Sequence, residues 1–177
     1  MKLSVTPKKS LGQNFLVNPR ILDKIVAAAE IIKEDTVLEV GPGTGNLTEK
    51  LAEKAERVIA VEKDRRLIEA LKLKFKNTNV EIIEGDILKI NFNDLKIKED
   101  YKIIGNIPYY ITSKFLRIAF EDWPKQKLIV LTIQKEVAQR IVAKSPKMNL
   151  LALSVQFFSE PKIIGYISKE NFRPVPK

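Results

Sequence analysis

The sequence predicts a doubly wound α/β fold, a mostly parallel sheet with helices on both faces. Short apolar runs of strand length alternate along the chain with amphipathic helical patterns. A glycine-rich turn follows the first of these runs. This alternation favours a parallel sheet, and 177 residues suffice for one domain with a sizeable core. Five short apolar runs have the length of strands: 36–40, 57–61, 80–83, 101–104 and 128–133.

Residues 1–35 are expected to form an N-terminal arm and a helix. Asn18 can cap a helix that begins near Pro19 and runs to about residue 31, with apolar residues at helical spacing. The amides of Gln13 and Asn14 lie just before it. They could contact a ligand, or they could be loop amides satisfied by the backbone.

The strand at 36–40 carries one acid, Glu39, and leads into Gly41-Pro42-Gly43-Thr44-Gly45 and a helix at 46–54. Strand, glycine loop and helix form the first half of a nucleotide-binding βαβ unit. The spacing is G-x-G-x-G, which differs from the dinucleotide pattern and lacks the Lys-Ser/Thr ending of a P-loop. By itself the loop is also compatible with a tight turn.

Acids end the next two strands. Glu62 lies about twenty residues past the start of the glycine loop, where such folds place an acid on ribose hydroxyls, and Asp64 competes for that role. A helix at 65–76 leads to the third strand. After it, Asp86 could accept a hydrogen bond from an adenine amine, or it could serve as a turn or cap residue.

The fourth strand leads into Gly105-Asn106-Ile107-Pro108-Tyr109-Tyr110. An amide, a proline and aromatic rings side by side suit a flat polar heterocycle, because the amide both donates and accepts and a ring can stack. The alternative is an ordinary strand-to-helix turn with an aromatic plug.

The remaining elements complete the predicted fold. Thr112 and Ser113 are candidate caps of the next helix. A strand at 128–133 precedes a helix at 134–140, and two closing strands are expected at 151–158 and 163–167. The last seven residues, 171–177, are expected to form a stiff extended arm.

Composition excludes several mechanisms. With no Cys and no His, the chain has no Ser-His-Asp triad, no Cys nucleophile and no His/Cys zinc site, and we expect no metal. A net charge of +9 favours a polyanionic partner such as nucleic acid, although a Lys/Glu-rich surface is the plainer interpretation. No apolar run is long enough to span a membrane and no secretory signal is visible, so a cytoplasmic protein is expected.

Two motifs together resemble a known family. Asn106-Ile107-Pro108-Tyr109 and the glycine loop resemble those of the S-adenosylmethionine-dependent adenine-N6 methyltransferases. Three further segments resemble the ribosomal RNA adenine dimethyltransferases: Leu11-Gly12-Gln13-Asn14-Phe15-Leu16, Gln134-Lys135-Glu136-Val137 and Phe172-Arg173-Pro174-Val175-Pro176-Lys177. The last segment favours the small-subunit, kasugamycin-resistance type over the macrolide-resistance enzymes of large-subunit rRNA. A non-catalytic rRNA-binding assembly factor remains an alternative.

The resemblance implies a Rossmann-like class I methyltransferase fold with a seven-stranded sheet. It implies N6-dimethylation of small-subunit rRNA adenines with S-adenosylmethionine, during ribosome biogenesis. Residues 1–177 would form a single catalytic domain, expected to be a monomer and to lack the family's C-terminal helical domain. The family also has a glycine before its Leu-Ser-Val stretch, where this chain reads Met148-Asn149-Leu150-Leu151-Ala152-Leu153-Ser154, so a different turn is expected.

The resemblance also assigns residues. Asn106, Ile107, Pro108 and Tyr109 would hold the target adenine, with Phe172 on its opposite face. The cofactor residues would be Asn14, Leu16, Gly41, Gly43, Gly45, Glu62, Asp86 and Asn106. Candidate contacts to the RNA are Lys8, Lys9, Lys114, Arg117, Arg140 and Lys144.

Overall fold

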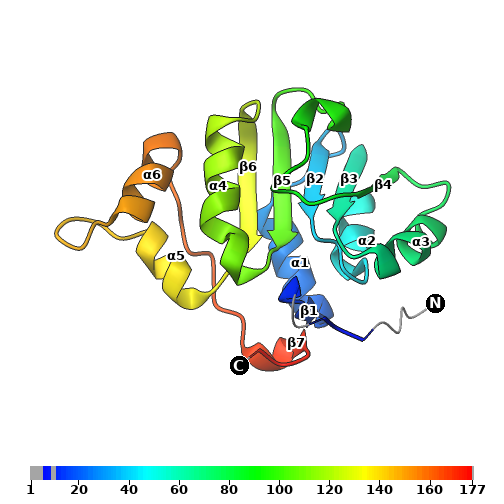
Figure 1. Cartoon of the computed structure of the whole chain (residues 1–177), viewed down its shortest axis with the longest axis horizontal. Coiled ribbons are helices and arrows are strands. Elements are labelled where there is room, and N and C mark those ends of the chain that lie inside the picture. The colour runs from blue at the N-terminus through cyan, green and yellow to red at the C-terminus, as the bar shows by residue number, and fades with distance from the viewer. Residues whose placement is uncertain (1–5, 9–10, 177) are drawn as a thin grey trace.

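The computed structural model describes residues 6–8 and 11–176, and its centre is a five-stranded parallel sheet (Figure 1). The strand order is β4-β3-β2-β5-β6. All four neighbouring pairs are parallel, so the carboxyl ends of the strands share one edge. The strands are β2 (Thr36–Val40), β3 (Arg57–Glu62), β4 (Val80–Glu84), β5 (Tyr101–Asn106) and β6 (Gln126–Thr132).

The predicted α/β class is confirmed, but the seven-stranded count is not. The two remaining strands, β1 (Phe15–Leu16) and β7 (Phe172–Arg173), pair with each other in a separate antiparallel ribbon. The chain therefore joins its N-terminal and C-terminal segments beyond the carboxyl edge of the main sheet, at the bottom of Figure 1.

Helices cover both faces of the sheet, as the alternation along β2 requires. Val37 packs in the cluster that contains α1 (Pro19–Ala28) and α2 (Asn46–Ala52). Leu38 points to the other cluster, with α4 (Thr112–Glu121) and the 3₁₀ turn Phe92–Leu95. A third helix, α3 (Arg65–Lys74), packs beside β4. Glu39 therefore lies on the same face as Val37, towards α2.

One predicted helix cap is confirmed and the other is wrong. The Asn18 side chain accepts a hydrogen bond from the Arg20 backbone N–H at the start of α1. Helix α4 instead follows directly from the 3₁₀ turn Tyr109–Ile111, with Ile111 at its N-cap and no side-chain cap. The preceding turn already curves the backbone, so Thr112 enters the helix as its first residue.

The predicted strand at 151–158 is wrong, because this segment forms helix α6 (Leu150–Phe158). Its buried residues, Ala152 and Val155, are three apart, which is helical spacing. The Asn149 side chain accepts from the Ala152 backbone N–H and caps the helix. With α5 (Lys135–Ile141), α6 forms a small lobe beside α4.

The second predicted closing strand, at 163–167, is also wrong. Within the part of the chain that the structure describes, this segment has no strand pairing. Ile164 is 68% exposed and Tyr166 64%, so the apolar residues that suggested a strand do not form a buried face. Among the described residues, no helix has the length and apolar character needed to cross a membrane.

Candidate functional site

A cavity lies at the carboxyl edge of the sheet, where five segments and Leu22 of α1 meet. Residues 11–16 of the N-terminal arm form one wall, and the glycine loop after β2 forms another. The ends of β3, β4 and β5 complete the lining. The structure brings all the predicted site residues to this cavity except Gly45 and Phe172.

Two positions of the glycine loop require glycine, because each has a positive φ and a close neighbour where a Cβ would lie. Gly43 has a φ of +57°, and a Cβ there would lie 2.8 Å from Cδ1 of Phe15, so the arm packs directly on the loop. Gly45 has a φ of +78°, and its Cβ would meet the ring of Phe75 at 2.9 Å. Gly45 therefore faces α3 behind the loop, which explains its absence from the cavity.

Glu62 ties the loop to the end of β3. Its Oε2 accepts from the Gly43 backbone N–H at 3.0 Å and its Oε1 accepts from the Asp64 backbone N–H at 2.8 Å. Burial raises the pKa of Glu62, and these backbone hydrogen bonds oppose the rise. The carboxylate is thus held in one orientation at the cavity.

Asp86 follows β4 at the next position along the edge. Its Oδ1 accepts from the Leu88 backbone N–H, and its Oδ2 pairs with Nζ of Lys63 at 2.9 Å. Burial acts to raise the pKa of Asp86, but the pairing with Lys63 and the backbone hydrogen bond keep it below its ordinary value. The group is therefore an ionised hydrogen-bond acceptor.

Asn106 is oriented by the N-terminal arm. Its Nδ2 donates to the backbone carbonyl of Asn14 at 2.9 Å, so the donor side of the amide faces the arm and the acceptor oxygen faces away from it. Ile107, Pro108 and Tyr109 line the cavity beside it. Pro108 has a φ of −58°, and burial raises the pKa of Tyr109, whose phenol is therefore neutral.

Phe172 lies elsewhere. It pairs with Leu16 in the β1–β7 ribbon and is 4% exposed, within the cluster that contains α1. Because the ring is enclosed by apolar neighbours, the structure gives no support to its predicted place on the opposite face of a target base.

Glu39 is a residue that the sequence analysis noted without giving it a role. It is 1% exposed and lines the cavity, and its Oε2 has no hydrogen-bond partner within the described ranges. Burial, helped by the nearby charge of Glu62, raises the pKa of Glu39 to about 8. The available signal was a lone acid in an apolar strand that runs straight into the glycine loop.

Comparison with known proteins identifies this arrangement of residues. The family model described as ribosomal RNA adenine dimethylase matches residues 5–177. The chain belongs to this family. A ribosomal RNA small subunit methyltransferase A from Dehalococcoides mccartyi is 46% identical over 172 residues, which are 96% of this chain and 59% of that protein. A protein of the same name from Mycoplasmopsis synoviae is 45% identical over 99% of this chain and 68% of its own length.

Solved structures agree with this placement in the dimethylase family. A dimethyladenosine transferase from Plasmodium falciparum superposes with a TM-score of 0.81 at 38% identity, over 92% of this chain and 59% of that one. The 23S rRNA methyltransferase ErmE gives 0.80 at 30% identity, over 93% of this chain and 66% of that one. The chain thus spans about three fifths of the first relatives that it matches.

Two further predictions concern metals and RNA. Among residues 6–8 and 11–176, no group of three or more acids is placed to hold a metal ion. Five of the candidate RNA-contacting residues are exposed: Lys8, Lys114, Arg117, Arg140 and Lys144. Arg117 pairs with Glu121 at 2.8 Å, and Lys9 lies outside the described residues.

Proposed function

We propose that this chain is the catalytic domain of an S-adenosylmethionine-dependent rRNA dimethyltransferase, which methylates N6 of adenines in small-subunit rRNA. The proposal places it in the cytoplasm, as a monomer acting on a precursor of the small ribosomal subunit. The main support is the side chain of Asn106, which lines the cavity and whose Nδ2 donates to the Asn14 carbonyl, a contact that does not use its acceptor oxygen.

The chemistry of the cavity suits a cationic adenosine cofactor. Three carboxyl groups line it, from Glu39, Glu62 and Asp86, and that of Asp86 is ionised. Among the described residues, Oε2 of Glu39 has no hydrogen-bond partner. In the proposed arrangement Glu62 accepts from the ribose hydroxyls and Asp86 from the adenine amine of the cofactor. Asn14, Leu16 and the glycine loop contact its methionine end. When bound, S-adenosylmethionine supplies an electrophilic methyl group on a sulfonium centre.

The target adenine is proposed to bind at the loop after β5. Its exocyclic nitrogen is a poor nucleophile because the lone pair is delocalised into the ring. Oδ1 of Asn106 and the backbone carbonyl of Ile107 accept hydrogen bonds from this amine, which favours a pyramidal nitrogen with a localised lone pair. Pro108 fixes the direction of the carbonyl, and Tyr109 stacks on the base, which must be unpaired to enter.

The proposal predicts a product that can be measured directly. The protein is incubated with labelled cofactor and unmethylated small-subunit rRNA in one reaction, and with labelled cofactor and unmethylated large-subunit rRNA in another. The RNA from each reaction is then analysed by mass spectrometry for N6-methylated adenine. Dimethyladenine in small-subunit rRNA is the expected result. Binding of RNA and cofactor without any methyl transfer would contradict a catalytic role and favour an assembly factor.

A second candidate is methylation of large-subunit rRNA. The likeness to ErmE, at a TM-score of 0.80 and 30% identity, favours it. The same experiment separates the two, because label in large-subunit rRNA alone would replace the first candidate.

A further inference from the structure

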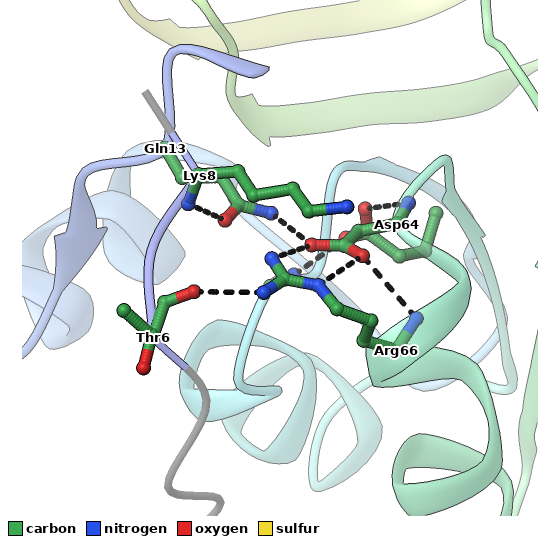
Figure 2. Close-up of polar contacts among 7 residues, drawn as sticks. Thr6, Lys8, Gln13, Asp64 and Arg66 are labelled. Atoms are coloured by element: carbon green, nitrogen blue, oxygen red, sulfur yellow. Dashed lines mark hydrogen bonds and ion pairs between the residues drawn. The ribbon is translucent and has the colours of Figure 1, made fainter. Parts of the chain in front are cut away.

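The N-terminal arm is attached to the turn between β3 and α3 by a hydrogen-bond network centred on Asp64 (Figure 2). Asp64 is 3% exposed and caps α3. Its Oδ2 accepts from Nε2 of Gln13 at 2.8 Å, and the guanidinium of Arg66 grips the same carboxylate through Nε and Nη2. One buried carboxylate therefore joins the arm to the end of β3.

The arm makes a second and a third contact in the same network. Nη1 of Arg66 donates to the backbone carbonyl of Thr6 at 3.0 Å. Oε1 of Gln13 accepts from the Lys8 backbone N–H at 2.8 Å. Gln13 thus bridges the arm backbone and Asp64, and Arg66 fixes the arm on the far side of that bridge, as Figure 2 shows.

These contacts matter because the arm is a wall of the cavity. Leu11 to Leu16 line it, next to the glycine loop. Asp64 is also linked to the predicted ribose-binding acid, since its backbone N–H donates to Oε1 of Glu62. The network therefore connects the position of the arm to the carboxylate of Glu62, which also lines the cavity.

We propose that Asp64 is a positioning residue, which through Gln13 and Arg66 holds residues 6–8 and 11–16 as the closing wall of the cofactor cavity. The inference rests on the proposed function for the identity of the ligand, but the attachment itself exists without ligand. Asp64 suits this role because Arg66 holds its pKa well below the usual range, so the carboxylate stays an acceptor in neutral and mildly acidic solution.

Two substitutions test the bridge without removing the helix cap. Gln13→Ala deletes the link to Asp64. Gln13→Glu places a second carboxylate against Asp64, which repels it at pH 8. At pH 5, close to the pKa of an ordinary Glu, a carboxyl held beside another carboxylate is protonated and can donate to Asp64 again. A purely structural loss would not be reversed by acid.

Hydrogen exchange in the ligand-free protein measures the arm directly. Each variant is compared with wild type at the same pH. In Gln13→Ala we expect the backbone N–H of Lys8 and the other arm amides to exchange at least tenfold faster. In Gln13→Glu we expect the same acceleration at pH 8 and none at pH 5. The matched control is Gln156→Ala, which removes an amide that donates to Ile141 and Ala143 in the α5–α6 lobe. It should leave arm exchange unchanged.

Calorimetry with S-adenosylmethionine then tests the consequence. The dissociation constant should rise about tenfold in Gln13→Ala, which corresponds to about 1.4 kcal/mol, and not in Gln156→Ala. Unchanged arm exchange in Gln13→Ala, or an opened arm with an unchanged dissociation constant, would overturn the inference. Failure of wild type to bind the cofactor would instead count against the proposed function, while the exchange data would still decide whether Asp64 holds the arm.

Discussion

Replacing Glu39 by Gln should change how the stability of the protein depends on pH. Glu39 is 1% exposed, and burial raises its pKa from 4.5 to about 8. Below pH 4.5 the carboxyl is protonated in both folded and unfolded chains. Between pH 4.5 and 8 it ionises only on unfolding, so its contribution to stability is lost as the pH rises.

The size of this loss follows from the two pKa values. At about 1.4 kcal/mol for each pH unit, a pKa difference of roughly 3.5 units amounts to about 5 kcal/mol by pH 8. The lowered pKa values of Asp35 and Asp86 act in the opposite sense, because their contributions are lost as the pH falls below about 4. Burial also raises the pKa of Glu62, which acts in the same sense as Glu39, so the effect of Glu39 is measured as the difference between wild type and a Glu39→Gln variant that keeps Glu62.

Urea unfolding of ligand-free protein at pH 5, 7 and 9 measures the effect, with fluorescence of the single tryptophan, Trp123, as the probe. Relative to wild type, Glu39→Gln should gain stability steadily from pH 5 to pH 8 and level off above it. Glu53→Gln, on the exposed end of α2, is the control and should track wild type. A constant difference between wild type and Glu39→Gln from pH 5 to 9 would refute the reasoning, because it would mean that Glu39 is ionised while buried.

Four further predictions concern the proposed reaction, the glycine loop and RNA binding. Asn106→Ala should keep cofactor binding by calorimetry and slow methyl transfer by about a hundredfold or more, by analogy with the loss of other positioned polar groups; unchanged turnover would refute its role. Glu62→Ala should raise the cofactor dissociation constant about tenfold or more, and an unchanged constant would exclude the ribose contact. Gly43→Ala should cost about 1–2 kcal/mol of stability in urea unfolding, because φ is +57° and its Cβ would meet Phe15; wild-type stability would show that the loop adapts. RNA affinity should fall about 50-fold between 50 and 200 mM salt if four phosphates are neutralised, whereas a flat response would make the positive charge a solubility feature.

The parallel sheet and its functional edge could be predicted because one pattern, an apolar run followed by a polar residue, repeats along the chain. Glu62, Asp86 and Asn106 each stand at or just past the end of an apolar run, and parallel strands bring such positions together. The C-terminal part lacked this repetition. Residues 151–158 are apolar apart from Ser154 and Gln156, and Phe157 is 80% exposed, so periodicity alone could not separate a helix from a strand.

The placement of Phe172 could not be predicted for a different reason. Its role depended on where a short terminal segment crosses the molecule, and no local pattern encodes that path. The pairing of Phe172 with Leu16 is a contact between the two ends of the described chain, and it turns the ring towards α1.

Two buried acids are sequence neighbours of assigned site residues: Glu39, which the sequence analysis left without a role, and Asp64, which it named only as a competitor of Glu62. Glu39 lies two positions before Gly41, and Asp64 lies two positions after Glu62. Glu39 lies within β2, whereas Asp64 follows the end of β3 and caps α3. What the sequence could not supply was whether α2 and the arm close over these acids. Burial raises the pKa of Glu39, so its carboxyl group is protonated where a solvated carboxylate would be ionised. Burial also places Asp64 where it can anchor the arm. The chemistry of both residues therefore depends on packing by segments distant in sequence.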